Sequence, residues 1–477
     1  MSQIPTSDRF EVTVLASEIA DLKESAPISA AGRVMLWRRM GGIVFGHIQD
    51  RSGRVQVAFR KDALGEETFK AWAGGVKMGD FVGVVGERWT TQKGEPTILV
   101  SELTMLTKTV ANLPDKWVGI VDTETRYRKR FLDLLTNEEA RQRVMVRSKV
   151  ISSLRRQLDE AGFLEVETPI LQGAASGAAA RPFVTHHHAL GQDLYLRIAP
   201  ETWLKRAVAG SFDRVYEIGK CFRNEGIDPS HLQEFTMLEY YAAYWNYRDS
   251  MEFIQRVVRE ILVEVNGSTT VTRDGVDLDF GREWPEVDYC RAVLDATGID
   301  LTEVSDLESL KGKIKAKRPD VDIAGAKSYA GLVDLLYKRA VRPSLIQPVF
   351  LIHHPTELVP LARRSDEDPR RLDMFQVVAG GWELVKAYSE LVDPVDQRSR
   401  LLEQVALREA GDEETMMMEE DFIEAMEYGM PPMSGLGLGI DRLVAFITDA
   451  PSLRETVLFP TLRTGFPGAS GTSNDEG

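Results

Sequence analysis

Cysteine is almost absent from this chain, with only Cys221 and Cys290 among 477 residues. Two cysteines without a metal-type spacing exclude a disulfide framework and a zinc knuckle. We therefore expect the protein to occupy a reducing compartment. Cys221 is interpreted as a small buried side chain rather than a nucleophile, because a buried thiol is inert.

Long apolar runs are absent as well. No apolar stretch reaches the roughly 18 residues that a membrane span requires. Residues 1–8 (MSQIPTSD) lack the basic and apolar regions of a secretory signal. These absences predict a cytoplasmic protein with no membrane partner.

The chain also lacks a surplus of basic residues, since 73 Asp and Glu against 58 Lys and Arg give a formal net charge of -15. That balance argues against a nucleic-acid partner only if charge is spread evenly, because a binding footprint is local. Between residues 28 and 61 the only acid is Asp50, and the basic residues are Arg33, Arg38, Arg39, Arg51, Arg54, Arg60 and Lys61. An acidic body with one basic module fits an RNA-binding protein; the alternative is an ordinary solvated face.

After a polar lead-in over residues 1–27, residues 28–110 contain five short β-rich runs separated by turns. Such spacing predicts a small OB-type β-barrel, a fold that binds single-stranded nucleic acid. Turns are expected at residues 50–53 and 93–94. The expected strands are residues 31–37, 43–50, 54–59, 81–86 and 97–100.

The rest of the chain is expected to form one larger domain over residues 136–463, which a linker over residues 111–135 precedes. Its first helix has a capping-box spacing at Thr136 and Glu139 and should end at Gly162. An appended helical and hairpin segment is expected over about residues 267–340. Residues 464–477, rich in glycine and serine with an acidic end, are expected to be disordered.

Three segments carry the chemistry: residues 221–226 (CFRNEG), 234–241 (EFTMLEYY) and 435–443 (GLGLGIDRL). Arg223 and Glu225 are two apart, so on an extended strand they would share a face and grip two parts of one ligand. A simple salt bridge between them is the alternative. The glycines before Arg442 predict a strand-to-helix junction at which backbone and guanidinium approach phosphates.

Together these segments resemble motifs 2 and 3 of the class II aminoacyl-tRNA synthetases. Residues 162–171 (GFLEVETPIL) resemble motif 1, which forms the dimer interface of that class. The resemblance spans about residues 28–462 and is closest to the lysyl-tRNA synthetases. It implies an α+β fold, in which a five-stranded OB-type anticodon-binding barrel precedes a catalytic domain built on an antiparallel sheet flanked by helices. It also implies a homodimer.

The resemblance further implies a lysine–tRNA ligase. Such an enzyme activates L-lysine with ATP to lysyl-adenylate and pyrophosphate, then transfers lysine to the 3'-terminal adenosine of tRNA(Lys). The substrate carboxylate is already ionised, so the site must supply alignment and positive charge rather than a general base. The implied catalytic residues are Arg223, which would bridge the substrate carboxylate and the α-phosphate, and Arg442, which would hold the γ-phosphate. The implied ATP-binding residues are Arg223, Glu225, His231, Phe235, Glu383 and Arg442.

Specificity for lysine would come from carboxylates, because a buried ammonium requires anionic and hydrogen-bonding partners. By resemblance, Glu390 and Tyr241 would bind the ε-ammonium with support from Glu239. Glu201 and the backbone at Gly177 would hold the α-ammonium. The full implied set is Gly177, Glu201, Arg223, Glu239, Tyr241, Lys386, Tyr388 and Glu390.

Two positions depart from the family pattern. Relatives usually carry asparagine where this chain has Lys386, and a metal-binding glutamate where it has Gln376. The expected cofactor is Mg²⁺, bound with ATP and held by Glu383 and Glu390, and loss of one carboxylate should weaken its binding. We hypothesise that the Lys386 ammonium partly replaces the positive charge of the metal beside the substrate carboxylate or the α-phosphate. The alternative is that Lys386 turns outward while the metal binds through phosphate oxygens.

For the barrel, the resemblance implies that Phe45 stacks on an anticodon base while Arg38, Gln56 and Glu95 contact base edges. Phe45 as ordinary barrel core is the alternative. A second function also stays open: a paralogue that binds tRNA or regulates without charging it, supported only by Gln376 and Lys386. The three histidines at residues 186–188 cannot chelate one metal together, because neighbours on a strand point to opposite faces.

Overall fold

The computed structural model describes residues 4–113, 119–226, 228–411 and 415–463, and the chain divides into two compact units after residue 136. The predicted disordered tail, residues 464–477, and residues 114–118 of the predicted linker lie outside the described residues. Within the described ranges, no helix is both long and apolar enough to cross a membrane.

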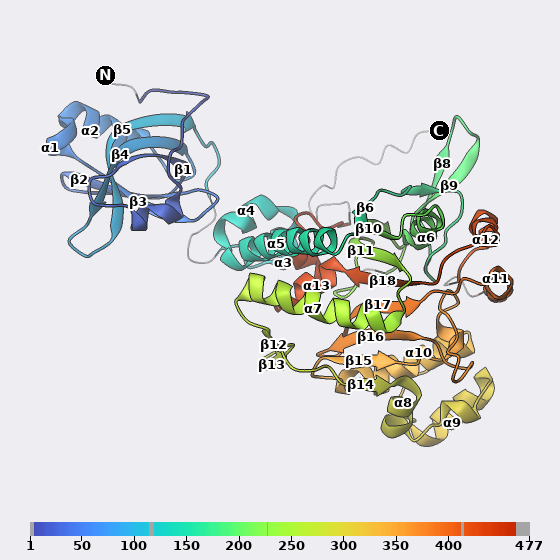
Figure 1. Cartoon of the computed structure of the whole chain (residues 1–477). Helices are drawn as coiled ribbons and strands as arrows, with labels where there is room; N and C mark the ends of the chain where they lie inside the picture. The colour runs from blue at the N-terminus through green and yellow to red at the C-terminus, as the bar shows by residue number, and fades with distance from the viewer. Residues whose placement is uncertain (1–3, 114–118, 227, 412–414, 464–477) are drawn as a thin grey trace, which may run out of the picture. The chain divides into compact units, whose positions relative to one another are not determined.

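The first unit is a closed barrel with the strand order β1-β2-β3-β5-β4, drawn in blue in Figure 1. Each predicted strand matches one of these five, although the second was predicted to extend one residue beyond the end of β2, and the OB-type barrel is confirmed. Asp50 N donates to Gly53 O at 3.0 Å in the predicted β2–β3 turn, and Gly94 adopts a φ of 83° between β4 and β5. The strands are β1 (Pro27–Met40), β2 (Ile43–Gln49), β3 (Arg54–Arg60), β4 (Phe81–Thr90) and β5 (Pro96–Thr107).

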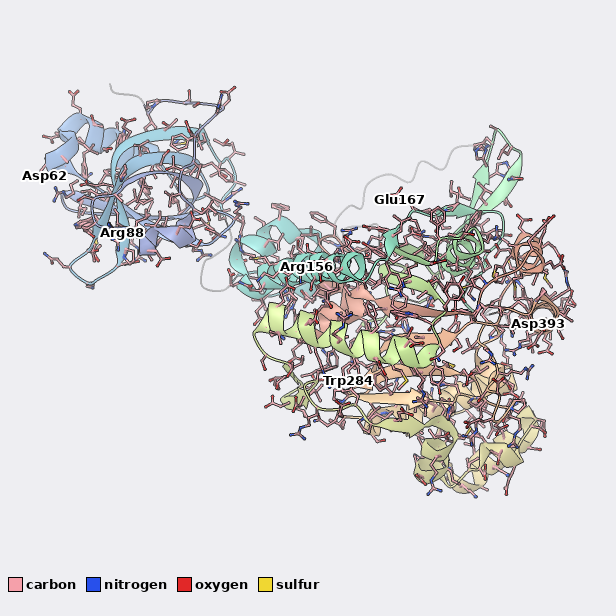
Figure 2. The ribbon with its side chains drawn as sticks, viewed as in Figure 1. Asp62, Arg88, Arg156, Glu167, Trp284 and Asp393 are labelled. Atoms are coloured by element: carbon pink, nitrogen blue, oxygen red, sulfur yellow. The ribbon has the colours of Figure 1, made fainter. Side chains whose placement is uncertain are left out.

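Short helices complete this unit: η1 (Ala16–Asp21), α1 (Lys61–Leu64), α2 (Glu66–Gly75), α3 (Thr123–Arg128) and α4 (Arg130–Thr136). Phe69 and Trp72 of α2 pack edge-on against Phe59 inside the barrel. Buried Arg88, labelled in Figure 2, donates to Ile19 O at 3.0 Å and so ties the lead-in to β4. The segment expected as a linker thus carries two short helices, α3 and α4.

The second unit is built on an eight-stranded sheet with the order β14-β15-β16-β17-β18-β11-β10-β6. Neighbours pair antiparallel except at the two edges, where β14–β15 and β10–β6 pair parallel. This confirms the predicted sheet-based catalytic fold, with parallel edges that the sequence did not suggest. The strands are β6 (Leu164–Glu165), β10 (Arg214–Phe222), β11 (Glu234–Ala243), β14 (Glu286–Asp288), β15 (Val349–Ile352), β16 (Met374–Ala379), β17 (Trp382–Ser389) and β18 (Met433–Gly439).

Three helices, α5 (Glu138–Glu160), α7 (Tyr247–Asn266) and α13 (Ile440–Ile447), cover one face of this sheet. Side chains alternate along a strand, so Leu238, Tyr240 and Ala242 of β11 point into that core. The residues between them point to the opposite face, which is therefore free to form a site. Figure 1 shows α7 on this face of the sheet, beside β17 and β18.

The predicted cap of α5 is wrong by one residue. Asn137 is the N-cap, and its side chain accepts from Ala140 N at 3.3 Å. Thr136 instead ends α4, where its hydroxyl donates to Leu132 O at 3.1 Å. Gly162 follows the end of α5 with a φ of 79°, a left-handed conformation that only glycine adopts at low cost.

Residues 267–340 hold a hairpin and helices, as expected, but they also contribute the edge strand β14. A separate core packs the helices α8 (Tyr289–Thr297), α9 (Leu307–Lys317) and α10 (Tyr329–Ala340) onto that edge. The hairpin is formed by β12 (Thr270–Arg273) and β13 (Val276–Asp279), and a small separate sheet is formed by β7 (Leu171–Gln172), β9 (Gln192–Leu196) and β8 (Val184–His187). The other helices are α6 (Glu201–Ala209), α11 (Pro394–Glu409) and α12 (Glu420–Glu427). The 3-10 turns are η2 (Leu301–Glu303), η3 (Arg342–Ser344), η4 (Thr356–Leu358) and η5 (Leu453–Thr456).

Candidate active site

A cavity of about 430 Å³ opens on the sheet face opposite α7. Glycines on β18 make room for it. A Cβ added to Gly435 would come within 2.1 Å of Glu390 Oε1 and 2.3 Å of Tyr241 Cε1. The predicted residues that line it are Gly177, Glu201, Arg223, Glu225, His231, Phe235, Glu239, Tyr241, Gln376, Glu383, Lys386, Tyr388 and Arg442.

Strand register explains how residues distant in sequence meet here. Glu239 lies opposite Gly437, Gly437 opposite Lys386, and Lys386 opposite Gln376. Paired residues on neighbouring strands share a face, so these four side-chain positions form one row across the cavity floor. Two residues along the strands, Tyr241, Gly435 and Tyr388 form a second row.

Around the Tyr241 row and the neighbouring Glu239 the cavity is acidic. Glu201, Glu239 and Glu390 are 5%, 4% and 2% exposed. Tyr388 Oη donates to Glu201 Oε1 at 2.7 Å, and Tyr241 Oη donates to Glu239 Oε2 at 3.2 Å. Burial raises the pKa of Glu239 to about 8, and the charge of Glu201 adds to the shift. Glu390 lies just behind the cavity wall.

Lys205 of α6 completes this acidic group, and the sequence analysis missed it. Its Nζ lies 2.8 Å from Glu201 Oε1 and also pairs with Glu390 Oε2. Burial alone would lower the pKa of Lys205, but Glu201 and Glu390 reverse that effect and raise the pKa. The only sequence signal was the spacing of four between Glu201 and Lys205, which places both on one helix face.

Arg223 and Glu225 lie in the loop that follows β10, which ends at Phe222, so the prediction that they share a strand face is wrong. Arg223 N donates to Gln233 O at 3.0 Å, which positions the loop. The guanidinium stacks over the Phe235 ring at 5.0 Å. No ion pair within 4.0 Å joins Arg223 and Glu225 in the described chain, so the simple salt bridge is not formed.

Arg442 lies at the junction of β18 and α13, as predicted. The adjacent Asp441 accepts from Thr236 N at 2.6 Å and pairs with Arg147 at 2.5 Å, which fixes the first turn of the helix. Arg442 Nη1 donates to Glu383 O at 3.2 Å and its side chain lines the cavity.

Cations with no acidic partner gather on the side of the cavity that Arg442 lines, which we call the cationic part. Among the described residues, Arg223, Arg442 and Lys386 have no carboxylate within 4.0 Å. Unpaired guanidinium and ammonium groups in a cleft favour a polyanion such as a triphosphate. Lys386 lies in the same row as Glu239, at the boundary between the acidic and cationic parts, and it faces the cavity rather than turning outward.

The expected metal residues do not converge. Glu390 is paired with Lys205 in the acidic part, whereas Glu383 lines the cavity beside Arg442 and accepts from Gln376 Nε2 at 2.9 Å. Over the described residues, no group of three or more His, Cys, Asp and Glu is arranged to hold an ion. Glu383 thus offers one hard oxygen ligand, and the remaining ligands would have to be phosphate oxygens and water.

Other predicted residues fall in simpler surroundings. Cys221 is 1% exposed, which confirms a buried side chain, and burial raises the pKa of its thiol to about 12. His231 lines the cavity, with Nδ1 2.8 Å from Asp228 Oδ2. His186 hydrogen-bonds to Asp193 at 2.8 Å on the exposed β8–β9 hairpin.

In the barrel unit, the predicted RNA-contacting residues share one outer face. Arg38 lies opposite Phe45 on β1 and β2, and Gln56 Nε2 donates to Glu95 Oε2 at 2.8 Å. Phe45 is half-buried and stays outside the barrel core, so it is not an ordinary core residue. His47, which lies opposite Gln56 and 3.4 Å from Glu95, was missed although its spacing of two from Phe45 predicted the same face.

Comparison with known proteins agrees with this geometry. Residues 122–463 match the tRNA synthetases class II (D, K and N), and residues 28–106 match the OB-fold nucleic acid binding domain. The chain belongs to the class II tRNA synthetases of the D, K and N group.

Within that class, the chain is similar to curated lysine–tRNA ligases over nearly its full length. It is 45% identical to the lysine–tRNA ligase of Roseiflexus sp. (strain RS-1), over 94% of this chain and 92% of that protein. It is 43% identical to that of Carboxydothermus hydrogenoformans, over 96% and 94% respectively. The enzyme of Enterococcus faecalis is 45% identical over the same two shares, 96% and 94%.

Proposed function

We propose that the protein is a lysine–tRNA ligase that activates L-lysine with ATP and transfers it to the 3'-terminal adenosine of tRNA(Lys). The observation that carries the proposal is the division of one cavity into a buried acidic part and a part lined by unpaired cations. An amino acid with two ammonium groups fits the acidic part, and a nucleoside triphosphate fits the cationic part. Their reacting groups would meet at the row that contains Lys386.

In the activation step, a lysine carboxylate oxygen attacks the α-phosphorus of ATP, a P–O bond forms, and the bond to the pyrophosphate oxygen breaks. Arg223 lies in the loop between β10 and β11 and stacks on Phe235. It is suited to hold both the carboxylate and the α-phosphate. Arg442 and His231 would neutralise the departing phosphates. Phe235 would support the adenine ring, and Glu225 would bind the adenine amino group.

In the transfer step, a ribose hydroxyl of the terminal adenosine attacks the lysyl carbonyl carbon, AMP leaves with the bonding electrons, and its phosphate takes up the hydroxyl proton. The acidic part of the cavity holds lysine throughout, so Glu201, Tyr241 and Glu390 would act in both steps. Arg38, Phe45, Gln56 and Glu95 would read the anticodon on the barrel face, with His47 as an additional contact.

The proposed metal is Mg²⁺ that enters with ATP. When bound it would neutralise phosphate charge, and Glu383 would be its protein ligand, because it lines the cavity beside Arg442. Gln376 offers only a neutral amide, so the protein supplies less negative charge than a pair of carboxylates would. We infer that the Lys386 ammonium takes over part of the positive charge beside the lysine carboxylate and the α-phosphate, since it faces the cavity without an acidic partner.

We also propose that the protein forms a homodimer through the region of β6. Leu164, Ile170 and Leu171 are 48%, 44% and 48% exposed around that two-residue edge strand. Neighbouring apolar side chains left in water favour association with a second copy. Sedimentation equilibrium of the intact protein tests this, and a monomer at micromolar concentration would contradict it.

The direct test of the proposed function is charging of a tRNA(Lys) transcript with radiolabelled lysine. The expected result is ATP-dependent lysylation that falls when the anticodon is changed. The competing paralogue that binds tRNA without charging it would retain the transcript on a filter and incorporate no lysine.

A further inference from the structure

Lys205 is a buried ammonium that the mechanism above does not use. Its side chain is 1% exposed, and it extends from α6 into the acidic group behind the cavity wall. Its Nζ contacts Glu201 on its own helix and Glu390 at the end of β17. These two carboxylates are the ones assigned to the α-ammonium and the ε-ammonium of the substrate, so one fixed cation joins both recognition groups.

Aromatic rings enclose the same ammonium. Lys205 Nζ lies 5.9 Å from the ring centroids of Tyr241 and Tyr388 and 5.6 Å from that of Phe422. Such distances allow cation–π attraction. Tyr388 also donates its hydroxyl to Glu201 Oε1, the oxygen that Lys205 contacts. The ammonium therefore has a built site of two carboxylates and three rings and is not a side chain that happens to pass nearby.

A charge count shows what this arrangement does. Glu201, Glu239 and Glu390 bring three negative charges when ionised, and Lys205 offsets one of them. The remaining two equal the two ammonium groups of lysine, and the lysine carboxylate is left to Arg223 and Lys386. An amino acid without a second ammonium would leave one buried carboxylate unmatched, which is costly.

We propose that Lys205 is a positioning and specificity residue: its ammonium holds Glu201 and Glu390 in place and sets the charge of the pocket to match a diamine amino acid. The inference rests on the proposed function. Lys205 does not touch the substrate, because the tyrosine rings and Glu201 form the wall between it and the cavity.

The first experiment is Lys205→Met, which keeps the length of the side chain and removes its charge. In lysine-dependent ATP–pyrophosphate exchange, the KM for lysine should rise at least tenfold, while the KM for ATP stays within twofold. Arg143→Met is the matched control, because Arg143 is also buried and paired, with Glu139 and Glu455, but lies on α5. It should lower thermal stability without changing the KM for lysine. If Lys205→Met does not fold, Lys205→Gln, which keeps a hydrogen-bond donor, carries the same expectation.

The second experiment separates charge from packing. Lys205→Ala removes three carbons and the ammonium, so propylammonium matches the missing group and 1-propanol is its neutral counterpart. Propylammonium should restore the KM for lysine, and 1-propanol should not. Equal rescue by both compounds, or an unchanged KM in the Met or Gln variant, would overturn the inference. Loss of lysine-dependent exchange in the unaltered protein would instead contradict the proposed function itself.

Discussion

The two parts of the cavity handle charge in opposite ways. In the acidic part, Glu201 and Glu390 share the ammonium of Lys205, and Glu201 and Glu239 accept hydrogen bonds from tyrosines. In the cationic part, Arg223 and Arg442 have no carboxylate partner in the described chain and instead stack on a ring or donate to a backbone carbonyl. The first part is organised before the ligand arrives, and the second waits for an anion.

This difference matches what each part must do. Recognition of one amino acid among twenty depends on groups held in place, because an unmatched buried charge penalises the wrong substrate. Acceleration of phosphoryl transfer depends on positive charge that stabilises the transition state. A cation already paired with a carboxylate of the protein would stabilise it less. A mutation in the acidic part should therefore raise the KM for lysine, whereas one in the cationic part should lower kcat.

The largest expected effect comes from the cationic part. Arg223→Ala should lower kcat for pyrophosphate exchange about 10²–10³-fold, because loss of one preorganised donor to a developing charge costs about that much. Steady-state exchange kinetics measure it. The control is Lys220→Ala, which removes a half-exposed lysine of β10 that is paired with Glu234 of β11. It should change kcat less than twofold.

The acidic part gives the second effect. Glu390→Gln should raise the KM for lysine about 30–150-fold with little change in the KM for ATP, because a charged hydrogen bond of about 2–3 kcal/mol is lost. It should also lower thermal stability, since Lys205 loses a buried partner. A fall in kcat with an unchanged KM for lysine would erase the distinction between the two parts.

The third prediction concerns pH. The pKa of Glu239 is raised to about 8 by burial, so this carboxyl is neutral below that pH in the empty pocket. An ammonium binds the ionised form, so the KM for lysine should fall as the pH rises toward 8 and level off above it. Glu239→Gln should abolish that dependence. A pH-independent KM in the unaltered protein would show that Glu239 is already ionised.

The fourth prediction separates the barrel from the cavity. Phe45→Ala should raise the KM for tRNA(Lys) about tenfold, since stacking of one base contributes about 1–3 kcal/mol. Pyrophosphate exchange in the absence of tRNA should stay unchanged, because the half-buried Phe45 lies on the outer face of the barrel. Charging and exchange assays on the same preparation give both values.

The smallest expected effect is at the boundary between the two parts. Lys386→Asn should raise the Mg²⁺ concentration needed for half-maximal exchange about threefold, because one positive charge beside the phosphates is lost. Lys338→Asn, which removes a cavity-lining lysine already paired with Asp334 at 2.7 Å, is the matched control. Equal Mg²⁺ requirements in all three proteins would assign Lys386 no electrostatic role.

The sequence was most informative where local spacing decides structure. Turn residues located the barrel hairpins, and the glycines before Arg442 located the strand-to-helix junction between β18 and α13. It was least informative where tertiary contacts decide. β10 ends at Phe222 because the chain leaves β11 soon afterwards, where Asn224 N donates to Arg181 O at 2.8 Å, and Asn137 rather than Thr136 caps α5. The pairing of Lys205 with Glu390 joins two elements far apart in the chain, so no local pattern revealed it.

The measurement that tests the central claim most directly is ATP–pyrophosphate exchange by the unaltered protein with each of the twenty amino acids in turn. A cavity whose three carboxylates, when ionised, exceed the one internal ammonium by two charges predicts exchange with lysine and background rates with the others. Exchange with a neutral or acidic amino acid would contradict the roles of Glu201, Glu239 and Glu390, and exchange with none would contradict activation altogether.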